Sequence, residues 1–396
     1  MNRTQTSVLV ISAVMIAWAI PVDAQTSQTI ERVSKQFIQA NDANRDGKLS
    51  LDEFPRRIRS KFGMVDTDKD GLVSAKEDAE YRAGRSRSGQ ANQRDAKRPR
   101  QNDASRIERD IVYATVNDRD LLLDLYLPNR AEMAKETNLK EGLLPVIVWI
   151  HGGGWKGGGK GSGGRARGAV DRGYALVDVE YRLSGEAIFP AQIQDCKASI
   201  RWIRANARKY GLDPKRIGVM GSSAGGHLVA LLGTSADTDE FDTDANSGHS
   251  SQVQAVCDLW GPTDLLQMDA QNLPGARWTH DSPESPESRL VGGPIQKEPH
   301  RSLAVRANPI GYIHKSEGLA PFLLVHGDSD LSVPPGQSQL LHDALKRAGA
   351  DVTLRFVKNG GHGLKGGEMT PEELFKVCIA FFDKHLQPAE SPSPTR

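Results

Sequence analysis

Residues 221–225 read Gly221-Ser222-Ser223-Ala224-Gly225 and fit the pattern G-x-S-x-G. A short, mostly apolar run at 216–220 comes before them, and residues 227–232 have the composition of a helix start. Strand, sharp turn and helix together form the setting in which a serine hydroxyl stands exposed above a parallel sheet. Ser223 is therefore the candidate nucleophile, while Ser222 is out of register with both glycines. Because serine between glycines also occurs in ordinary loops, this interpretation needs support from the rest of the chain.

Strand-like and helix-like segments alternate through residues 107–386. The predicted strands lie at 111–116, 121–127, 145–150, 174–179, 217–220, 253–259, 322–325 and 352–357. The first two form an antiparallel hairpin with a turn at 117–120. Residues 191–210 have a helical period and end before Gly211, a good C-cap position. We therefore expect an α/β fold, with a mostly parallel, doubly wound sheet and helices on both faces.

A glycine loop, His151-Gly152-Gly153-Gly154-Trp155, directly follows the predicted strand at 145–150. Glycines let backbone amides converge without side chains in the way. Acyl transfer needs such donors, because the carbonyl oxygen becomes negatively charged in the tetrahedral intermediate. The candidate oxyanion hole consists of the amides of Gly153, Gly154 and Ala224.

A phosphate-binding loop is the alternative interpretation of this region. Residues 154–160 match the first seven positions of a Walker A motif. Gly161, however, stands where a serine or threonine should hold magnesium, which argues against this alternative.

A general base and an acid are expected after the nucleophile, in the order Ser, Asp, His. His362 follows the predicted strand at 352–357 and lies among glycines on an expected exposed turn, which suits a base. Asp328 and Asp330 both follow the strand at 322–325 and compete for the role of the acid. Asp328 could instead cap the turn by accepting bonds from backbone amides. Position alone does not separate these two aspartates.

Two N-terminal segments fit the pattern D-x-[DN]-x-[DN]-G-x5-E and resemble a pair of EF-hand loops. Oxygen ligands at this spacing form a cage for a hard cation, so calcium is the expected cofactor. The candidate ligands are Asp42, Asn44, Asp46, Lys48 and Glu53 in the first loop and Asp66, Asp68, Asp70, Leu72 and Glu77 in the second, with Lys48 and Leu72 contributing backbone carbonyls. Leu49 and Val73 are placed to form a short two-stranded contact. The alternative is a pair that folds but binds no ion.

The flanking segments predict the organisation of the whole chain. Residues 1–24 resemble a secretory signal, with an uncleaved anchor as the alternative, so we expect a secreted or periplasmic protein without a later membrane span. Residues 25–81 form the predicted EF-hand pair, which we expect to be all-α. Residues 82–106 are rich in Arg, Ser and Gln and predict a flexible basic linker, with a nucleic-acid arm as the less favoured alternative. The tail, residues 387–396, is expected to be disordered.

The net charge and the cysteine count limit what this chain binds and how it is cross-linked. The formal net charge is +1 over 396 residues, which argues for neither a nucleic-acid partner nor a strongly acidic substrate. The three cysteines are odd in number and far apart, so no disulfide framework follows from them.

Residues 107–386 resemble an α/β-hydrolase esterase of the hormone-sensitive-lipase-like kind, closest to the bacterial branch similar to feruloyl and acetyl-xylan esterases. The matching stretches are residues 123–128, 151–155, 179–183, 213–217, 221–227, 260–264 and 326–334. The resemblance implies Ser223 as nucleophile, His362 as base and the second aspartate, Asp330, as acid. It also implies a small-molecule or carbohydrate ester as substrate. Because serine acyl transfer needs no metal, we expect calcium to act outside the catalytic cycle.

Two stretches depart from that family's pattern: the extra glycines at 157–164, and residues 264–316, which stand where such enzymes carry substrate-covering insertions. Two other functions stay open. One is a serine peptidase or lactonase on the same fold, and the other is a non-catalytic, calcium-dependent binding protein.

Overall fold

The computed structural model describes residues 27–54, 62–81, 106–129, 142–161, 163–315 and 318–387. The chain divides into two units at residues 102 and 103, and each is described by itself. The predicted signal segment, the linker up to residue 105 and the tail from residue 388 lie outside the described residues. Within the described part, no helix has both the length and the apolar character needed to cross a bilayer.

The first unit contains α2 (Ser27–Asn41), α3 (Phe62–Val65) and two short strands, β1 (Lys48–Ser50) and β2 (Leu72–Ser74). The strands pair antiparallel with Leu49 opposite Val73, which confirms the contact predicted between the two loops. This ribbon adds β-structure to a module that we expected to be all-α. The small core comprises Phe37, Ile38, Leu49, Phe54, Phe62, Val65 and Val73.

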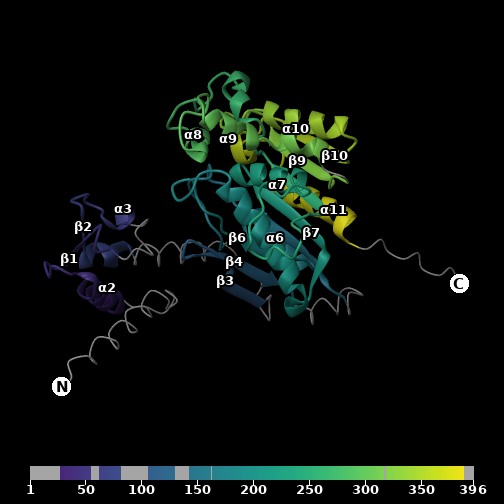
Figure 1. Cartoon of the computed structure of the whole chain (residues 1–396). Coiled ribbons are helices and arrows are strands. Elements are labelled where there is room, and N and C mark those ends of the chain that lie inside the picture. The colour runs from purple at the N-terminus through teal and green to yellow at the C-terminus, as the bar shows by residue number, and fades with distance from the viewer. Residues whose placement is uncertain are drawn as a thin grey trace. The chain divides into compact units, whose positions relative to one another are not determined.

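The second unit is built on an eight-stranded sheet in the order β10-β9-β8-β7-β5-β6-β4-β3 (Figure 1). Its strands are β3 (Arg106–Val116), β4 (Arg119–Leu127), β5 (Leu144–Ile150), β6 (Ala175–Val179), β7 (Leu212–Ser222), β8 (Ala255–Leu259), β9 (Phe322–Gly327) and β10 (Val352–Val357). Only the pairs β3–β4 and β4–β6 are antiparallel, so the prediction of a mostly parallel sheet is confirmed.

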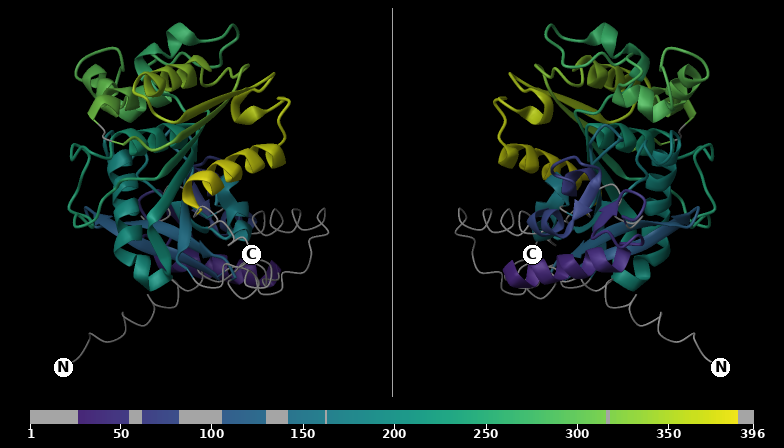
Figure 2. Two further views of the ribbon diagram at one scale, coloured as in Figure 1. Left: turned by 90° about the vertical axis from the view of Figure 1, so that its right-hand side faces the viewer. Right: turned by 90° about the vertical axis from the view of Figure 1, so that its left-hand side faces the viewer.

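Helical elements cover both faces of this sheet, as predicted. On one face lie α6 (Ala191–Tyr210), α7 (Ala224–Thr234) and α10 (Gly336–Arg347), and on the other lie the 3-10 segment η3 (Gly164–Arg172) and α11 (Pro371–Leu386). Figure 2 shows α11, in yellow, across the sheet from the teal helices. Along β5, Val146, Val148 and Ile150 enter one core while Ile147 and Trp149 enter the other. Burial on both faces explains the continuous apolar run that predicted this strand.

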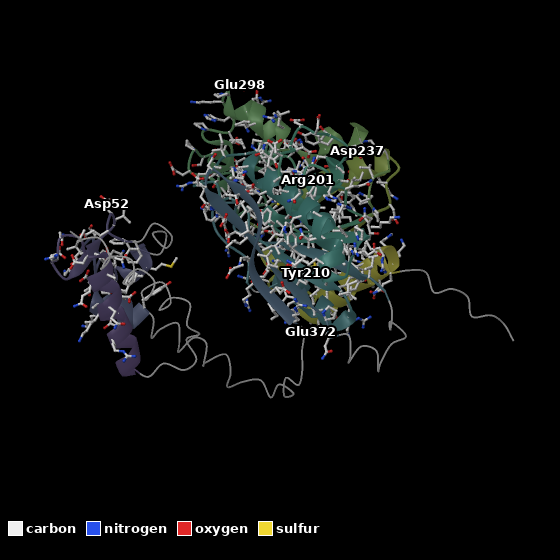
Figure 3. All side chains as sticks on the ribbon, turned by 60° about the horizontal axis from the view of Figure 1, so that its bottom comes forward. Asp52, Arg201, Tyr210, Asp237, Glu298 and Glu372 are labelled. Carbon is white, nitrogen blue, oxygen red and sulfur yellow. The ribbon has the colours of Figure 1, made fainter. Side chains whose placement is uncertain are left out.

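Helix α6 has the bounds that its period predicted. Gly211 ends it in the left-handed conformation, with a φ of 68°, and donates its amide to the carbonyl of Ala207. A residue without a Cβ adopts this conformation at least cost. The buried Arg201 of α6, labelled in Figure 3, donates to the carboxylate of Asp242 at 2.8 Å and so ties the helix to the loop that follows α7.

Residues 264–315, between β8 and β9, contain only short elements. These are η4 (Leu265–Gln267), η5 (Asp269–Gln271), α8 (Pro286–Val291), α9 (His300–Arg306) and η6 (Pro309–Lys315). Because β5, β7, β8, β9 and β10 are parallel neighbours, the loops after their carboxyl ends gather at one edge of the sheet. The predicted nucleophile, glycine loop, acid and base all lie in those loops.

Candidate active site

Ser223 occupies the turn between β7 and α7. Its backbone has φ 55° and ψ −121°, a conformation that L-residues rarely adopt. Close backbone packing holds it there. A Cβ added to Gly225 would lie 2.1 Å from the carbonyl oxygen of Ile150, and one added to Gly221 would lie 2.2 Å from that of Gly225. Only glycine fits at these two positions, which is the mechanical requirement that the pattern G-x-S-x-G expresses.

His362 links Ser223 to Asp330. Its Nε2 lies 3.1 Å from Ser223 Oγ, and its Nδ1 lies 2.7 Å from Asp330 Oδ2. His362 belongs to the 3-10 turn η7 (His362–Leu364) after β10, and its side chain is about one-third exposed (32%) rather than fully exposed. With the Nδ1 proton facing Asp330, Nε2 accepts the hydroxyl proton of Ser223. The structure thus brings together the three residues that the sequence placed in order.

The structure separates the two aspartates that sequence position left open. Asp330 is buried, and its Oδ1 accepts the amides of Ser332 at 2.8 Å and Val333 at 3.0 Å while its Oδ2 faces His362. Asp328 is exposed, and its carboxylate accepts the hydroxyl of Ser329 instead. Asp330 therefore both orders its own turn and orients the imidazole.

A second histidine that sequence reasoning treated only as part of a strand end also approaches this acid. Buried His326 has Nε2 3.4 Å from Asp330 Oδ2 and 3.0 Å from the carbonyl of Val333, and its Nδ1 lies 2.7 Å from Ser338 Oγ. Burial raises the pKa of Asp330, but the hydrogen bonds from His326 and His362 outweigh it and hold that pKa well below its usual range. Asp330 is consequently a carboxylate at all ordinary pH values. The four-residue spacing from His326 to Asp330 was the only sequence signal for this contact.

The glycine loop after β5 lies against the nucleophile turn. A Cβ on Gly152 would be 2.6 Å from the carbonyl of Ser222 and 3.3 Å from the Cβ of Ser223. Gly153 and Gly154 have φ values of 118° and 58°. Among the described residues, no group accepts a hydrogen bond from the amides of Gly153, Gly154 or Ala224. Three free donors beside the serine are what an oxyanion hole requires.

His151 and His227 support this arrangement from outside the reaction centre. His151 stacks on Tyr181 with ring centroids 4.2 Å apart, and the Tyr181 hydroxyl donates to the carbonyl of His151 at 3.0 Å. His227 Nε2 lies 2.7 Å from the carbonyl of Ala307, and burial lowers the pKa of His227 to about 4 even though that hydrogen bond opposes it. Both histidines therefore brace loops that border the reaction centre.

The lysine of the Walker-like stretch is engaged elsewhere. Lys160 Nζ lies 2.6 Å from Asp110 Oδ1 and 2.7 Å from Asp124 Oδ1. The neighbouring amides of Gly161 and Gly163 each donate to buried Asp178 at 2.7 Å. These contacts fix the glycine-rich segment to β4 and β6 and leave its lysine paired with carboxylates.

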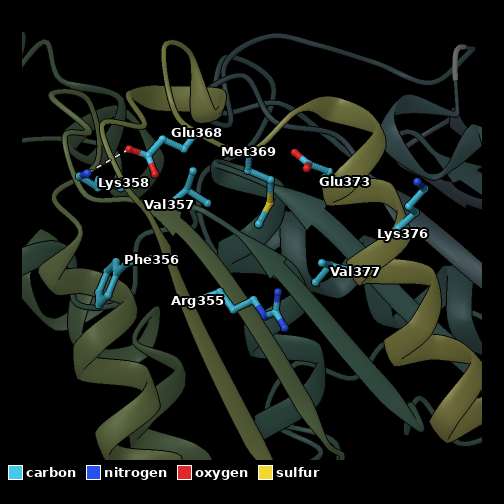
Figure 4. A pocket seen from close by; sticks show the side chains of 9 residues that line it. All are labelled: Arg355, Phe356, Val357, Lys358, Glu368, Met369, Glu373, Lys376 and Val377. Atoms are coloured by element: carbon cyan, nitrogen blue, oxygen red, sulfur yellow. Dashed lines mark ion pairs between the residues drawn. The ribbon is translucent and has the colours of Figure 1, made fainter.

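The insertion at 264–315 contacts two parts of the site. Pro286, at the start of α8, would lie 3.1 Å from a Cβ on Gly154, and the amide of Arg277 donates to the carbonyl of Leu331 at 2.9 Å. A surface hollow of about 500 Å³ lies elsewhere, between β10 and α11 (Figure 4). Its lining includes Arg355, Phe356, Lys376 and the ion pair Lys358–Glu368, and none of the three triad residues. Side-chain geometry, rather than this hollow, therefore marks the reaction centre.

The second N-terminal loop has the donors that calcium prefers. Carboxylate oxygens of Asp66, Asp68 and Asp70 lie within 4.8 Å of one another, and Asp66 Oδ1 is buried without a hydrogen-bond partner in the described residues. Glu77 is fixed by the amide of Thr67 at 2.9 Å and that of Ser74 at 2.9 Å. A converging, oxygen-only set with an unpaired buried oxygen fits a hard divalent cation.

The first loop has the same outline with fewer carboxylates. Asp42 Oδ2 accepts the amide of Gly47 at 2.8 Å, and Glu53 accepts those of Ala43 and Asn44 at 3.1 and 3.2 Å. The side chain of Lys48, whose carbonyl is the expected ligand, reaches Asp70 of the second loop at 2.8 Å. The two loops are therefore joined by this ion pair as well as by their ribbon.

Solved structures similar to this chain are esterases. A truncated carbohydrate esterase from gut microbiota superposes with a TM-score of 0.57 at 30% identity, covering 73% of this chain and 99% of that one. A second neighbour is esterase 2 of the planctomycete Thermogutta terrifontis, solved with propionate bound. It superposes with a TM-score of 0.53 at 25% identity, covering 72% of this chain and 97% of that one. The second unit thus has the α/β-hydrolase fold.

The BD-FAE family model matches residues 123–345, more than half of the 396 residues, and the chain belongs to that family. The EF-hand model matches residues 35–56 and 58–77. Esterase LipQ of Mycobacterium tuberculosis is 32% identical over 257 residues, 64% of this chain and 56% of that protein. Isoprenylcysteine alpha-carbonyl methylesterase ICME of Arabidopsis thaliana is 28% identical over 296 residues, which are 70% of this chain and 62% of that protein. The chain spans little more than half the length of these curated relatives.

Proposed function

We propose that this protein is a serine carboxylic-ester hydrolase. The observation that carries the proposal is the continuous hydrogen-bonded line from Ser223 Oγ through His362 to Asp330 Oδ2. Ser223 attacks the ester carbonyl while His362 Nε2 takes its proton. Asp330 holds the imidazole in the required tautomer and stabilises its positive charge. The amides of Gly153, Gly154 and Ala224 bind the oxyanion of the tetrahedral intermediate.

The second half of the cycle uses the same groups. Protonated His362 gives its proton to the departing alcohol oxygen, which leaves an acyl group on Ser223. A water molecule then loses a proton to His362 Nε2 and attacks the acyl carbonyl. Collapse of the second intermediate returns the proton to Ser223 Oγ and releases the acid.

We propose short-acyl or aryl esters, such as those on polysaccharides, as substrates. The support comes from resemblance: one structural neighbour is named a carbohydrate esterase, and another was solved with propionate bound. The expected signal at residues 1–24 would place the enzyme outside the cytoplasm, in the secreted or periplasmic fraction, where such substrates occur. Signal-sequence cleavage and cell fractionation test this location.

The direct test replaces Ser223→Ala and, as a matched control, the neighbouring Ser222→Ala. Hydrolysis of p-nitrophenyl acetate should fall to background in the first variant and persist in the second, with both variants folded by circular dichroism. Undiminished turnover by Ser223→Ala would overturn the proposal. Rates on acetylated xylo-oligosaccharides, methyl ferulate and longer-chain esters then define the substrate class.

We also propose that the EF-hand loops bind calcium outside the catalytic cycle. Asp66, Asp68, Asp70, Glu77 and the carbonyl of Leu72 would hold the ion in the second loop. Titration of the full chain by calorimetry should show binding that Glu77→Gln weakens and Glu80→Gln leaves unchanged. Glu80 is the matched control because it is exposed and pairs with Lys76 rather than with the loop. No heat at millimolar calcium would contradict this proposal.

A further inference from the structure

Beyond the triad, one arginine reaches the turn that carries the base. Arg165 lies in η3, directly after the glycines that depart from the family's pattern. Its Nη2 donates to the carbonyl of Gly363, the residue after His362, at 3.3 Å. The two residues are 198 positions apart in the sequence. The guanidinium is half-buried, and no carboxylate of the described residues pairs with it.

The same guanidinium approaches the base from a second side. Arg165 Cζ lies 4.9 Å from the centroid of the Trp260 ring, a cation–π distance. Trp260 in turn meets the His362 ring at 6.4 Å with an interplanar angle of 70°. The backbone amide of Trp260 donates to the carbonyl of Val325 at 2.8 Å, so the backbone that carries this indole is fixed to β9. Arg165 therefore contacts both the backbone and the aromatic neighbour of the base.

The glycines before Arg165 explain why its position is well defined. Gly163 donates its amide to buried Asp178, and a Cβ on Gly164 would lie 2.0 Å from the ring of Trp149. The start of η3 is thus pressed against β5 and β6. The turn that Arg165 holds needs such support, because Gly363 and Leu364 have φ values of 76° and 62°.

We infer that Arg165 is a positioning residue that holds His362 in line with Ser223, through the Gly363 carbonyl and the face of Trp260. The inference rests on the proposed ester hydrolysis. Misplacing a catalytic group by about 1 Å costs up to about 100-fold in rate. Loss of one of several supports should reduce kcat by about 10-fold and leave KM within about 2-fold, because Arg165 acts on the base and not on the ester.

The test compares Arg165→Met, Arg165→Lys and Arg167→Met. Methionine keeps the apolar stem but loses the charge and the donors. Lysine keeps a charge over Trp260 and one donor for Gly363. Arg167 is the matched control, since it lies on the same 3-10 segment with its guanidinium 4.8 Å from the Tyr126 ring. Titration of reactive serine with a fluorophosphonate gives the concentration of folded sites, so that kcat is expressed per site.

Arg165→Met should lower kcat about 10-fold with KM nearly unchanged. Arg165→Lys should recover most of the lost kcat. Arg167→Met should retain wild-type kcat. Wild-type kcat in Arg165→Met, or an equal loss in Arg167→Met, would overturn the inference. Failure of Arg165→Lys to exceed Arg165→Met would also overturn it, and this comparison remains decisive if methionine reduces folding. An inactive wild type, or an active Ser223→Ala, would instead overturn the proposed function.

Discussion

At the scale of single residues, the chemistry of this site depends on what surrounds each ionisable group. Asp330 and Asp258 are both buried aspartates at strand ends, but their environments act in opposite directions. Asp330 accepts hydrogen bonds from two histidines and two amides, whereas Asp258 accepts one bond, from the amide of Gly261 at 2.9 Å. Its second oxygen has no partner in the described residues. Substitution of Asp330 and substitution of Asp258 should therefore have different effects.

Asp330→Asn should reduce kcat by about 10³- to 10⁴-fold, because the amide favours the wrong imidazole tautomer and cannot balance its charge. Asp328→Asn is the matched control, since this exposed carboxylate contacts only Ser329 among the interactions described. Steady-state hydrolysis of p-nitrophenyl acetate measures both. A larger loss in Asp328→Asn would assign the acid to the other aspartate.

The stability of the second unit should depend on pH through Asp258. Burial raises the pKa of Asp258 to about 7, against the smaller effect of the Gly261 amide. An unfolded aspartate titrates near 4, so between about pH 4 and 7 the folded state binds more protons than the unfolded state. The contribution of Asp258 to the free energy of unfolding is therefore fully present below about pH 4 and is lost as pH rises to about 7.

Denaturant unfolding of wild type and Asp258→Asn between pH 4 and 8 tests this sign. The free energy of unfolding of wild type should fall relative to that of the variant as pH rises, by at most about 4 kcal/mol, and level off above about pH 7. A constant difference, or one that grows in favour of wild type, would show that folding does not raise the pKa of Asp258.

At the scale of elements, the loops after β5 and β7 lock together through backbone contacts that exclude side chains. Gly225→Ala should cost about 2 kcal/mol or more, because its Cβ would meet the carbonyl of Ile150 at 2.1 Å. Gly159→Ala is the matched control, with nothing within 4 Å of the added Cβ, and should change stability by less than about 0.5 kcal/mol. Equal free energies of unfolding for the two variants would contradict this packing.

The sequence predicted elements well where burial produces a pattern and poorly where it does not. The apolar run of β5 and the period of α6 gave bounds within one residue. By contrast, β3 begins at Arg106, five residues before the predicted strand, because Arg106, Glu108 and Asp110 are not buried and the pairing is irregular between Glu108 and Ile111. A strand end without a buried face has no hydrophobic alternation to reveal it.

The candidate site likewise has features that the sequence pattern predicted and features that it did not. The order of Ser223, Asp330 and His362 was readable because each follows a predicted strand. The choice between Asp328 and Asp330 was not, since both follow the same strand, and the family resemblance supplied it. The contact of Arg165 with the base turn arises only when segments 198 residues apart pack together, so no local pattern signals it. For the contact of His326 with Asp330, the four-residue spacing was the only signal.

At the scale of the whole molecule, two units divide the proposed tasks. The triad proposed for hydrolysis, Ser223, His362 and Asp330, lies in the second unit, whereas the proposed calcium ligands belong to the first. Removal of calcium with EGTA should therefore lower the thermal stability of the first unit and leave kcat for p-nitrophenyl acetate unchanged within about 2-fold. Differential scanning calorimetry and parallel rate assays measure the two effects. A loss of activity that returns with calcium would instead couple the units.

The position of a covalent adduct shows whether Ser223 is the nucleophile. The full chain is treated with a fluorophosphonate, digested and mapped by tandem mass spectrometry. We expect one phosphonyl group on Ser223 and none on the adjacent Ser222, with hydrolysis lost in proportion to labelling. A phosphonyl group on Ser222 or another residue, or full activity after complete labelling of Ser223, would contradict it.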